Sequence, residues 1–98
     1  MVKHIVLIKP KRGKSEAEAT ALLAEIGGLK SRIPGILDYS GGADISGGGR
    51  TEGYTHGFVM TFASKEALGA YLPHPEHTAV AAKVIAFSED ILAFDYEY

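Results

Sequence analysis

VKHIVLIK, residues 2–9, is the stretch that decides how the chain folds, because its branched apolar residues predict a β-strand. Successive side chains of a strand point to opposite sides of a sheet. One side of this strand carries Val2, His4, Val6 and Ile8, and the other carries Ile5 and Leu7. A single polar ring, His4, therefore interrupts a face that is otherwise suited to a hydrophobic core.

Helix and strand signals alternate along the rest of the chain. Ser15 and Glu18 form a capping box that begins a helix, and Pro34 ends this helix near residue 32. Ser64 caps a short helical turn, and Pro75 suits the first position of a further helical stretch. The predicted strands cover residues 2–9, 36–45, 54–62 and 91–98. This β-α-β-β-α-β order predicts an α+β, ferredoxin-like sandwich in a single domain over residues 1–98.

The final predicted strand is apolar on both sides, like the first. Leu92, Phe94, Tyr96 and Tyr98 share one side, and Ile91, Ala93 and Asp95 share the other. Two helices cover only one face of a sheet, and an antiparallel sheet in a monomer usually has polar residues on its open face. We therefore expect a second copy of the sheet to cover the open face in a homodimer.

Composition excludes several classes of function. The 98 residues have a net charge of −2 without a basic excess, so no nucleic-acid partner is predicted. The absence of cysteine removes disulfides, thiolate zinc sites and cysteine nucleophiles. The apolar runs are too short for a signal peptide or a membrane span, so we expect a cytoplasmic protein without a membrane partner.

The segment YLPHPEH, residues 71–77, places Tyr71 and His77 at the entrance of the last helical stretch. The ferredoxin-like topology puts this entrance at the same end of the sheet as His4 and Asp95. We expect His77 to remove a proton, Tyr71 to hydrogen-bond a developing oxyanion and Asp95 to orient His77. The reactions that fit are proton abstraction next to a carbonyl, enolisation and intramolecular condensation.

Neither a metal nor a cofactor is predicted. His74, Glu76 and His77 form a weak metal pattern, because a proline lies inside it and no third ligand is fixed. The glycines at 41, 42, 47, 48 and 49 do not match a phosphate-binding loop, because no helix follows them. We interpret them as part of a hairpin connection or flap.

Five short motifs follow one another over nearly the whole chain: VKHIV at 2–6, EGYTH at 52–56, TFAS at 61–64, YLPHPEH at 71–77 and FDY at 94–96. In their order and spacing the sequence resembles the stress-responsive dimeric α/β-barrel (Dabb) family. This resemblance implies a ferredoxin-like subunit whose sheet pairs with that of a second subunit to form a dimeric α/β barrel.

One plant branch of that family cyclises a polyketide without a cofactor. The resemblance implies that the base of those cyclases corresponds to His77 and their helper tyrosine to Tyr71. Their strand histidine corresponds to His4, and their orienting aspartate to Asp95. The cyclases also have a pocket tyrosine where this sequence has Ile26, so a polyketide substrate is not implied.

We therefore expect a homodimer that binds a small, partly apolar molecule between sheet and helices. As an enzyme it would be a cofactor-independent cyclase, lyase or isomerase. Two alternatives stay open: a non-catalytic, stress-related structural or binding protein, and a monooxygenase of the wider dimeric α/β-barrel group.

Overall fold

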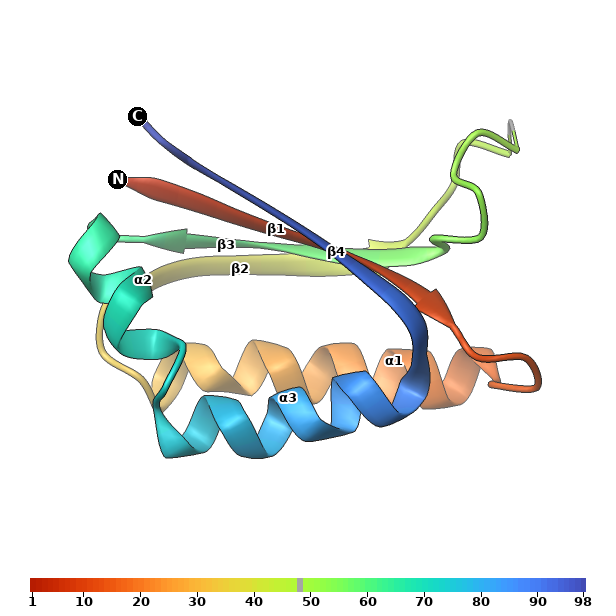
Figure 1. The fold of residues 1–98 in the computed structure, drawn as a ribbon, viewed down its shortest axis with the longest axis horizontal. Helices are drawn as coiled ribbons and strands as arrows, with labels where there is room; N and C mark the ends of the chain where they lie inside the picture. Colours follow the sequence, from red (N-terminus) through yellow and green to blue (C-terminus); the bar gives the residue numbers. More distant parts are fainter. Residues whose placement is uncertain (48) are drawn as a thin grey trace.

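The computed structural model describes residues 1–47 and 49–98 and has the predicted ferredoxin-like α+β fold (Figure 1). Its elements are β1 (Val2–Pro10), α1 (Glu16–Gly27), the 3-10 helix η1 (Gly28–Ser31), β2 (Ile36–Ala43), β3 (His56–Phe62), α2 (Lys65–Tyr71), α3 (Pro75–Phe87) and β4 (Ser88–Glu97). Gly48, part of the predicted flap, lies outside the described residues.

The four strands form one antiparallel sheet in the order β2-β3-β1-β4, so β1 and β3 are central as the topology requires. On β1, His4 lies between Met60 of β3 and Asp95 of β4. At the other end of β1, Ile8 lies opposite His56 of β3. His4 and His56 are therefore on the same face of the sheet, at opposite ends.

Local capping fixes the helix starts. The Ser15 hydroxyl accepts a hydrogen bond from the Glu18 amide at 3.1 Å, and Ser64 accepts one from the Ala67 amide at 3.1 Å. These bonds satisfy amides that the first turn of a helix otherwise leaves unpaired. Both predicted caps are confirmed.

The strand boundaries differ from the predicted ones at several places, and β2 ends at Ala43 rather than at residue 45. β3 begins at His56 rather than residue 54, and β4 begins at Ser88, directly after α3. β4 starts early because Ser88 and Asp90 already pair with β1, across an irregularity between Lys9 and Pro10.

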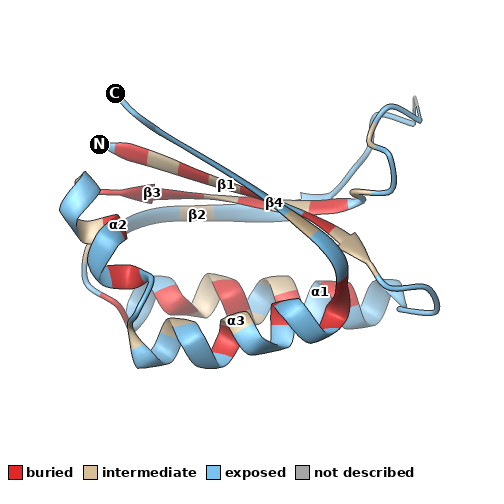
Figure 2. Cartoon of the chain, viewed as in Figure 1, coloured by how far each residue is buried: buried red, intermediate tan, exposed pale blue. Residues whose placement is uncertain are grey.

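Helices cover one face of the sheet, and Figure 2 shows the buried residues concentrated between the two layers. The opposite face is open in this single chain. Its large exposed apolar side chains include Leu7, Leu92, Phe94, Tyr96 and Tyr98, and Phe94 is 65% exposed. Among the described residues, no helix has the length and apolar character needed to cross a membrane.

Candidate functional site

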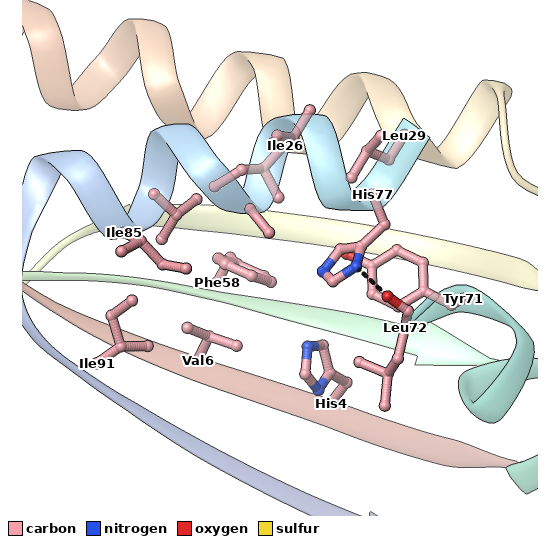
Figure 3. A pocket seen from close by; sticks show the side chains of 13 residues that line it. His4, Val6, Ile26, Leu29, Phe58, Tyr71, Leu72, His77, Ile85 and Ile91 are labelled. Atoms are coloured by element: carbon pink, nitrogen blue, oxygen red, sulfur yellow. Dashed lines mark hydrogen bonds between the residues drawn. The ribbon is translucent and has the colours of Figure 1, made fainter. Parts of the chain in front are cut away.

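A cavity of about 210 Å³ lies between the sheet and α3 (Figure 3). Its walls are mostly apolar. The lining residues are His4, Val6, Ile26, Leu29, Phe58, Tyr71, Leu72, His77, Val80, Ala81, Val84, Ile85 and Ile91. Three of the four residues predicted to form the site, His4, Tyr71 and His77, therefore line one cavity.

Tyr71 is the most deeply buried of the three, with 1% of its surface exposed. Its ring lies 4.9 Å from the Phe62 ring and 4.2 Å from the His77 ring, measured between centroids. Burial, with a smaller effect from Tyr39, raises the pKa of Tyr71 to about 12. The hydroxyl is therefore protonated at neutral pH and can donate a hydrogen bond to a ligand.

His77 is held by the backbone of the turn between α2 and α3. Its Nδ1 lies 2.9 Å from the Leu72 carbonyl oxygen, which only accepts hydrogen bonds, so Nδ1 carries the proton. The Nε2 atom of the neutral ring then has a free lone pair. This tautomer is the one that a general base acting through Nε2 requires.

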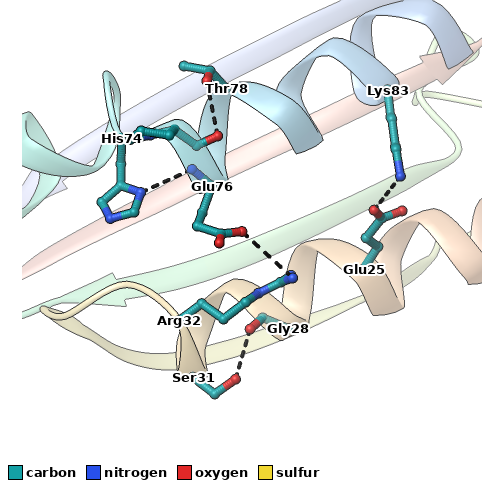
Figure 4. Close-up of polar contacts among 9 residues, drawn as sticks. Glu25, Gly28, Ser31, Arg32, His74, Glu76, Thr78 and Lys83 are labelled. Atoms are coloured by element: carbon teal, nitrogen blue, oxygen red, sulfur yellow. Dashed lines mark hydrogen bonds and ion pairs between the residues drawn. The ribbon is translucent and has the colours of Figure 1, made fainter.

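Polar contacts fix the start of α3, which carries His77 (Figure 4). His74 is the N-cap residue, and its Nδ1 accepts a hydrogen bond from the Glu76 amide at 3.1 Å. The Glu76 carboxylate lies 3.8 Å from Arg32 at the end of η1. Further along α3, Lys83 donates to Glu25 of α1 at 2.6 Å. His74 is half-buried at this position.

The predicted contact between Asp95 and His77 is wrong. The Asp95 carboxylate instead lies 2.5 Å from Nδ1 of His4, because the register of β1 and β4 places these two residues directly opposite each other. Nδ1 of His4 donates to the carboxylate, and Nε2 points toward the cavity (Figure 3). Asp95 lies on the helix-covered face of the sheet, opposite His4, but its side chain is 41% exposed.

Three polar atoms at the cavity are without a protein partner in the described part of the chain: Tyr71 Oη, His77 Nε2 and His4 Nε2. No fully buried side-chain nitrogen or oxygen of residues 1–47 and 49–98 lacks a hydrogen bond. These three atoms are therefore each accessible to solvent, and the residues that carry them line the cavity. They form a set of one donor and two acceptors on an apolar wall, which suits a small molecule with a few polar groups.

Sequence reasoning missed Leu72, whose carbonyl sets the His77 tautomer, and the apolar wall residues Phe58, Ile85 and Ile91. A backbone acceptor has no signal in the sequence. By contrast, Val80 and Val84 are spaced four residues apart along α3, which is the spacing of side chains on one side of a helix, and both line the cavity. Within the described residues no cluster of three or more histidine, cysteine, aspartate or glutamate side chains is arranged to hold a metal.

The strand order and the helix layer define an α+β protein of the ferredoxin-like class. Similarity to known proteins specifies its family. Residues 2–98 match the family description Stress responsive A/B Barrel Domain, so the chain belongs to the Dabb family.

Two curated relatives cover almost the whole chain. Olivetolic acid cyclase of Cannabis sativa is 34% identical over 95 residues, which are 97% of this chain and 94% of that protein. A stress-response A/B barrel domain-containing protein of Arabidopsis thaliana is 33% identical over 96 residues, which are 98% of this chain and 88% of that protein.

Solved structures share the fold of this chain. The crystal structure of an Arabidopsis thaliana protein superimposes with a TM-score of 0.93 at 33% identity, covering 100% of this chain and 95% of that one. A dimeric ferredoxin-like protein of unknown function from Jannaschia has a TM-score of 0.85 at 28% identity, covering 99% and 98%. Hydroxynitrile lyase from Passiflora edulis has a TM-score of 0.87 at 25% identity, covering 97% and 90%.

Proposed function

We propose that this Dabb protein is a homodimer whose cavity binds a small, partly apolar carbonyl or hydroxyl compound and catalyses a cofactor-independent proton transfer. The reaction class is that of a cyclase, lyase or isomerase. The observation that carries the proposal is the set of three unpartnered polar atoms, Tyr71 Oη, His77 Nε2 and His4 Nε2, on one apolar cavity within the described residues.

In this mechanism His77 is the general base. Its Nε2 lone pair takes a proton from a carbon next to a carbonyl or from a hydroxyl group, while Nδ1 keeps its proton on the Leu72 carbonyl. The electrons of the broken bond move to the carbonyl oxygen of an enolate, or expel a leaving group in a lyase reaction. The protonated Tyr71 hydroxyl donates to the developing negative charge. His77 then returns its proton to the product.

His4 and Asp95 complete the proposed site. The Asp95 carboxylate fixes the ring of His4 and stabilises any positive charge on it. His4 Nε2 then provides a hydrogen-bonding group across the cavity from His77. In this chain the carboxylate therefore acts on the strand histidine rather than on the base.

Two relatives of named activity support the enzymatic class, a cyclase at 34% identity and a hydroxynitrile lyase at 25% identity. Both names denote reactions that need proton transfer. The proposed dimer is supported by the open apolar face of the sheet and by a relative of the same fold, at 28% identity, that is dimeric.

The first test measures proton transfer with two probes: 5-nitrobenzisoxazole, which reports abstraction of a proton from carbon, and mandelonitrile, a hydroxynitrile. His77→Ala should reduce kcat/KM by at least about 100-fold, the usual contribution of a positioned base. Tyr71→Phe should reduce it by about 100-fold through loss of the oxyanion donor.

His74→Asn is the matched control. Asparagine caps a helix as well as histidine does, and residue 74 does not line the cavity, so this variant should keep full activity. Equal rates in the wild type and His77→Ala would contradict the proposed base.

A non-catalytic, stress-related binding role is the second candidate, favoured by the relative that is named as a stress-response protein. Displacement of the dye ANS from the cavity separates the two functions. Ligands that displace ANS from the wild type, together with no turnover of either probe, would favour binding without chemistry.

A further inference from the structure

The segment formed by residues 44–47 and 49–55 projects from the sheet on the side away from the helices, the side of the open apolar face (Figure 1). We call it the β2–β3 arm. Its described part carries Ile45, which is 97% exposed, the highest value among the large apolar residues of the described chain. The Ile45 side chain is therefore not buried by its own subunit.

The base of the arm is braced rather than loose. The Asp44 amide donates to the Thr55 carbonyl at 2.7 Å and continues the β2–β3 ladder. The Tyr54 hydroxyl donates to the Asp90 carboxylate at the start of β4. Gly53 has a φ of 90° and lies against Lys9, where an added Cβ would come within 2.8 Å of the lysine Cε. The arm therefore stands away from its own sheet with its base fixed on β1 and β4.

Between the arm and the sheet lies a hollow of about 430 Å³. Its floor includes Leu7, Gly57 and Leu92, which belong to the open face, and its rim includes Arg50 and Glu52 of the arm. The hollow is thus continuous with the apolar face. A partner that covers the face must also meet the arm.

We infer that the β2–β3 arm reaches onto the second copy of this chain and buries Ile45 in the dimer interface. This inference rests on the proposed dimer and adds the arm to it. A second copy is the favoured occupant because a relative of the same fold is dimeric, and because the face beside the arm presents the same apolar side chains on both copies. In a two-fold interface the same patch serves on both subunits, so each arm contact occurs twice.

The experiment compares three aspartate variants by sedimentation velocity over a concentration series, with circular dichroism as a check on folding. Phe94→Asp places charge on the open face and should give monomer. Ile45→Asp should raise the dimer dissociation constant at least tenfold, since the lost contact is counted twice. Ala82→Asp is the control: Ala82 is an exposed apolar residue of α3, lies away from the open face and does not line the cavity, and the variant should dimerise like the wild type.

The outcomes separate the arm from the dimer itself. If Phe94→Asp is monomeric and Ile45→Asp has the dimer dissociation constant of the wild type, the proposed role of the arm is wrong and the proposed dimer is still supported. A monomeric wild type, or a dimer in Phe94→Asp as tight as the wild type, would overturn both.

A second measurement uses the absence of cysteine from the chain. An environment-sensitive fluorophore on Ile45→Cys should shift to shorter wavelength as concentration drives dimerisation, whereas the same label on Ala82→Cys, on the exposed side of α3, should not shift. A concentration-independent spectrum at position 45 would contradict burial of the arm.

Discussion

Two buried histidines, His4 and His56, lie on the same face of the sheet and differ in how their rings are used. Nδ1 of His56 lies 2.8 Å from the Thr55 hydroxyl, and Nε2 lies 3.1 Å from the Glu16 carboxylate, so both nitrogens are bonded. His4 bonds Asp95 through Nδ1 alone and presents Nε2 to the cavity. Burial and a carboxylate partner are common to both. The free Nε2 atom distinguishes His4, a candidate site residue, from His56, whose ring has a structural role.

Among these changes, the largest loss of stability is expected at His56, whose two ring nitrogens are both bonded. His56→Ala should lower the free energy of unfolding by about 3 kcal/mol, because it removes a large buried side chain and leaves a cavity in its place. His77→Ala should cost under about 1 kcal/mol, since that ring is only half-buried. Urea denaturation of both variants checks this order. Equal losses would remove the distinction between the two ends of the sheet.

The stability of the folded protein should also depend on alkaline pH, because Tyr71 is buried at the cavity. An unfolded tyrosine ionises near its ordinary pKa of 10.0, whereas burial raises the pKa of Tyr71 to about 12. Between these values the unfolded state releases the proton and the folded state keeps it, so stability falls as pH rises from 10 to 12 and is unaffected below 10. The loss attributable to Tyr71 is at most about 3 kcal/mol.

Tyr71→Phe should remove this part of the alkaline loss. Tyr39 keeps a similar contribution in the variant, because burial raises its pKa to about 12 as well. Urea denaturation at pH 9, 10 and 11 compares the two proteins. A variant that loses stability with pH as steeply as the wild type would show that burial does not raise the pKa of Tyr71.

The smallest effect should come from the two carboxylates. Asp95→Asn and Glu16→Gln should each cost under about 1 kcal/mol, because the two carboxylate side chains are 41% and 69% exposed and water screens their charges. Proton and nitrogen NMR of the histidine rings sharpens the comparison. Asp95→Asn should disturb the signals of the cavity residues His4 and Tyr71, whereas Glu16→Gln should disturb those of His56 alone.

The fold could be predicted from the sequence because the signals for its helices and strands are local. The caps at Ser15 and Ser64, and the two apolar sides of residues 2–9, depend on residues close together in the chain. The gathering of Tyr71, His77 and His4 also followed, since topology alone decides which end of the sheet each residue occupies.

The pairing within the site required information beyond these patterns. Asp95 meets His4 rather than His77 because of strand register, which shifts the whole side-chain set when it changes by a single residue. The His77 tautomer depends on the Leu72 carbonyl, and every residue has such a carbonyl. Neither contact leaves a pattern of residue types that a sequence could reveal.

The direct passage from α3 into β4 links the two halves of the molecule. Phe87 is the last helical residue and Ser88 the first of the strand, and the Ser88 hydroxyl donates to the Val84 carbonyl at 2.6 Å. The helix that lines the cavity therefore continues directly into the strand that carries Phe94 on the open face. If association changes ligand affinity by some factor, ligand changes association by the same factor. In the proposed dimer, the helix–strand junction would be the route by which a ligand in one cavity affects the other cavity.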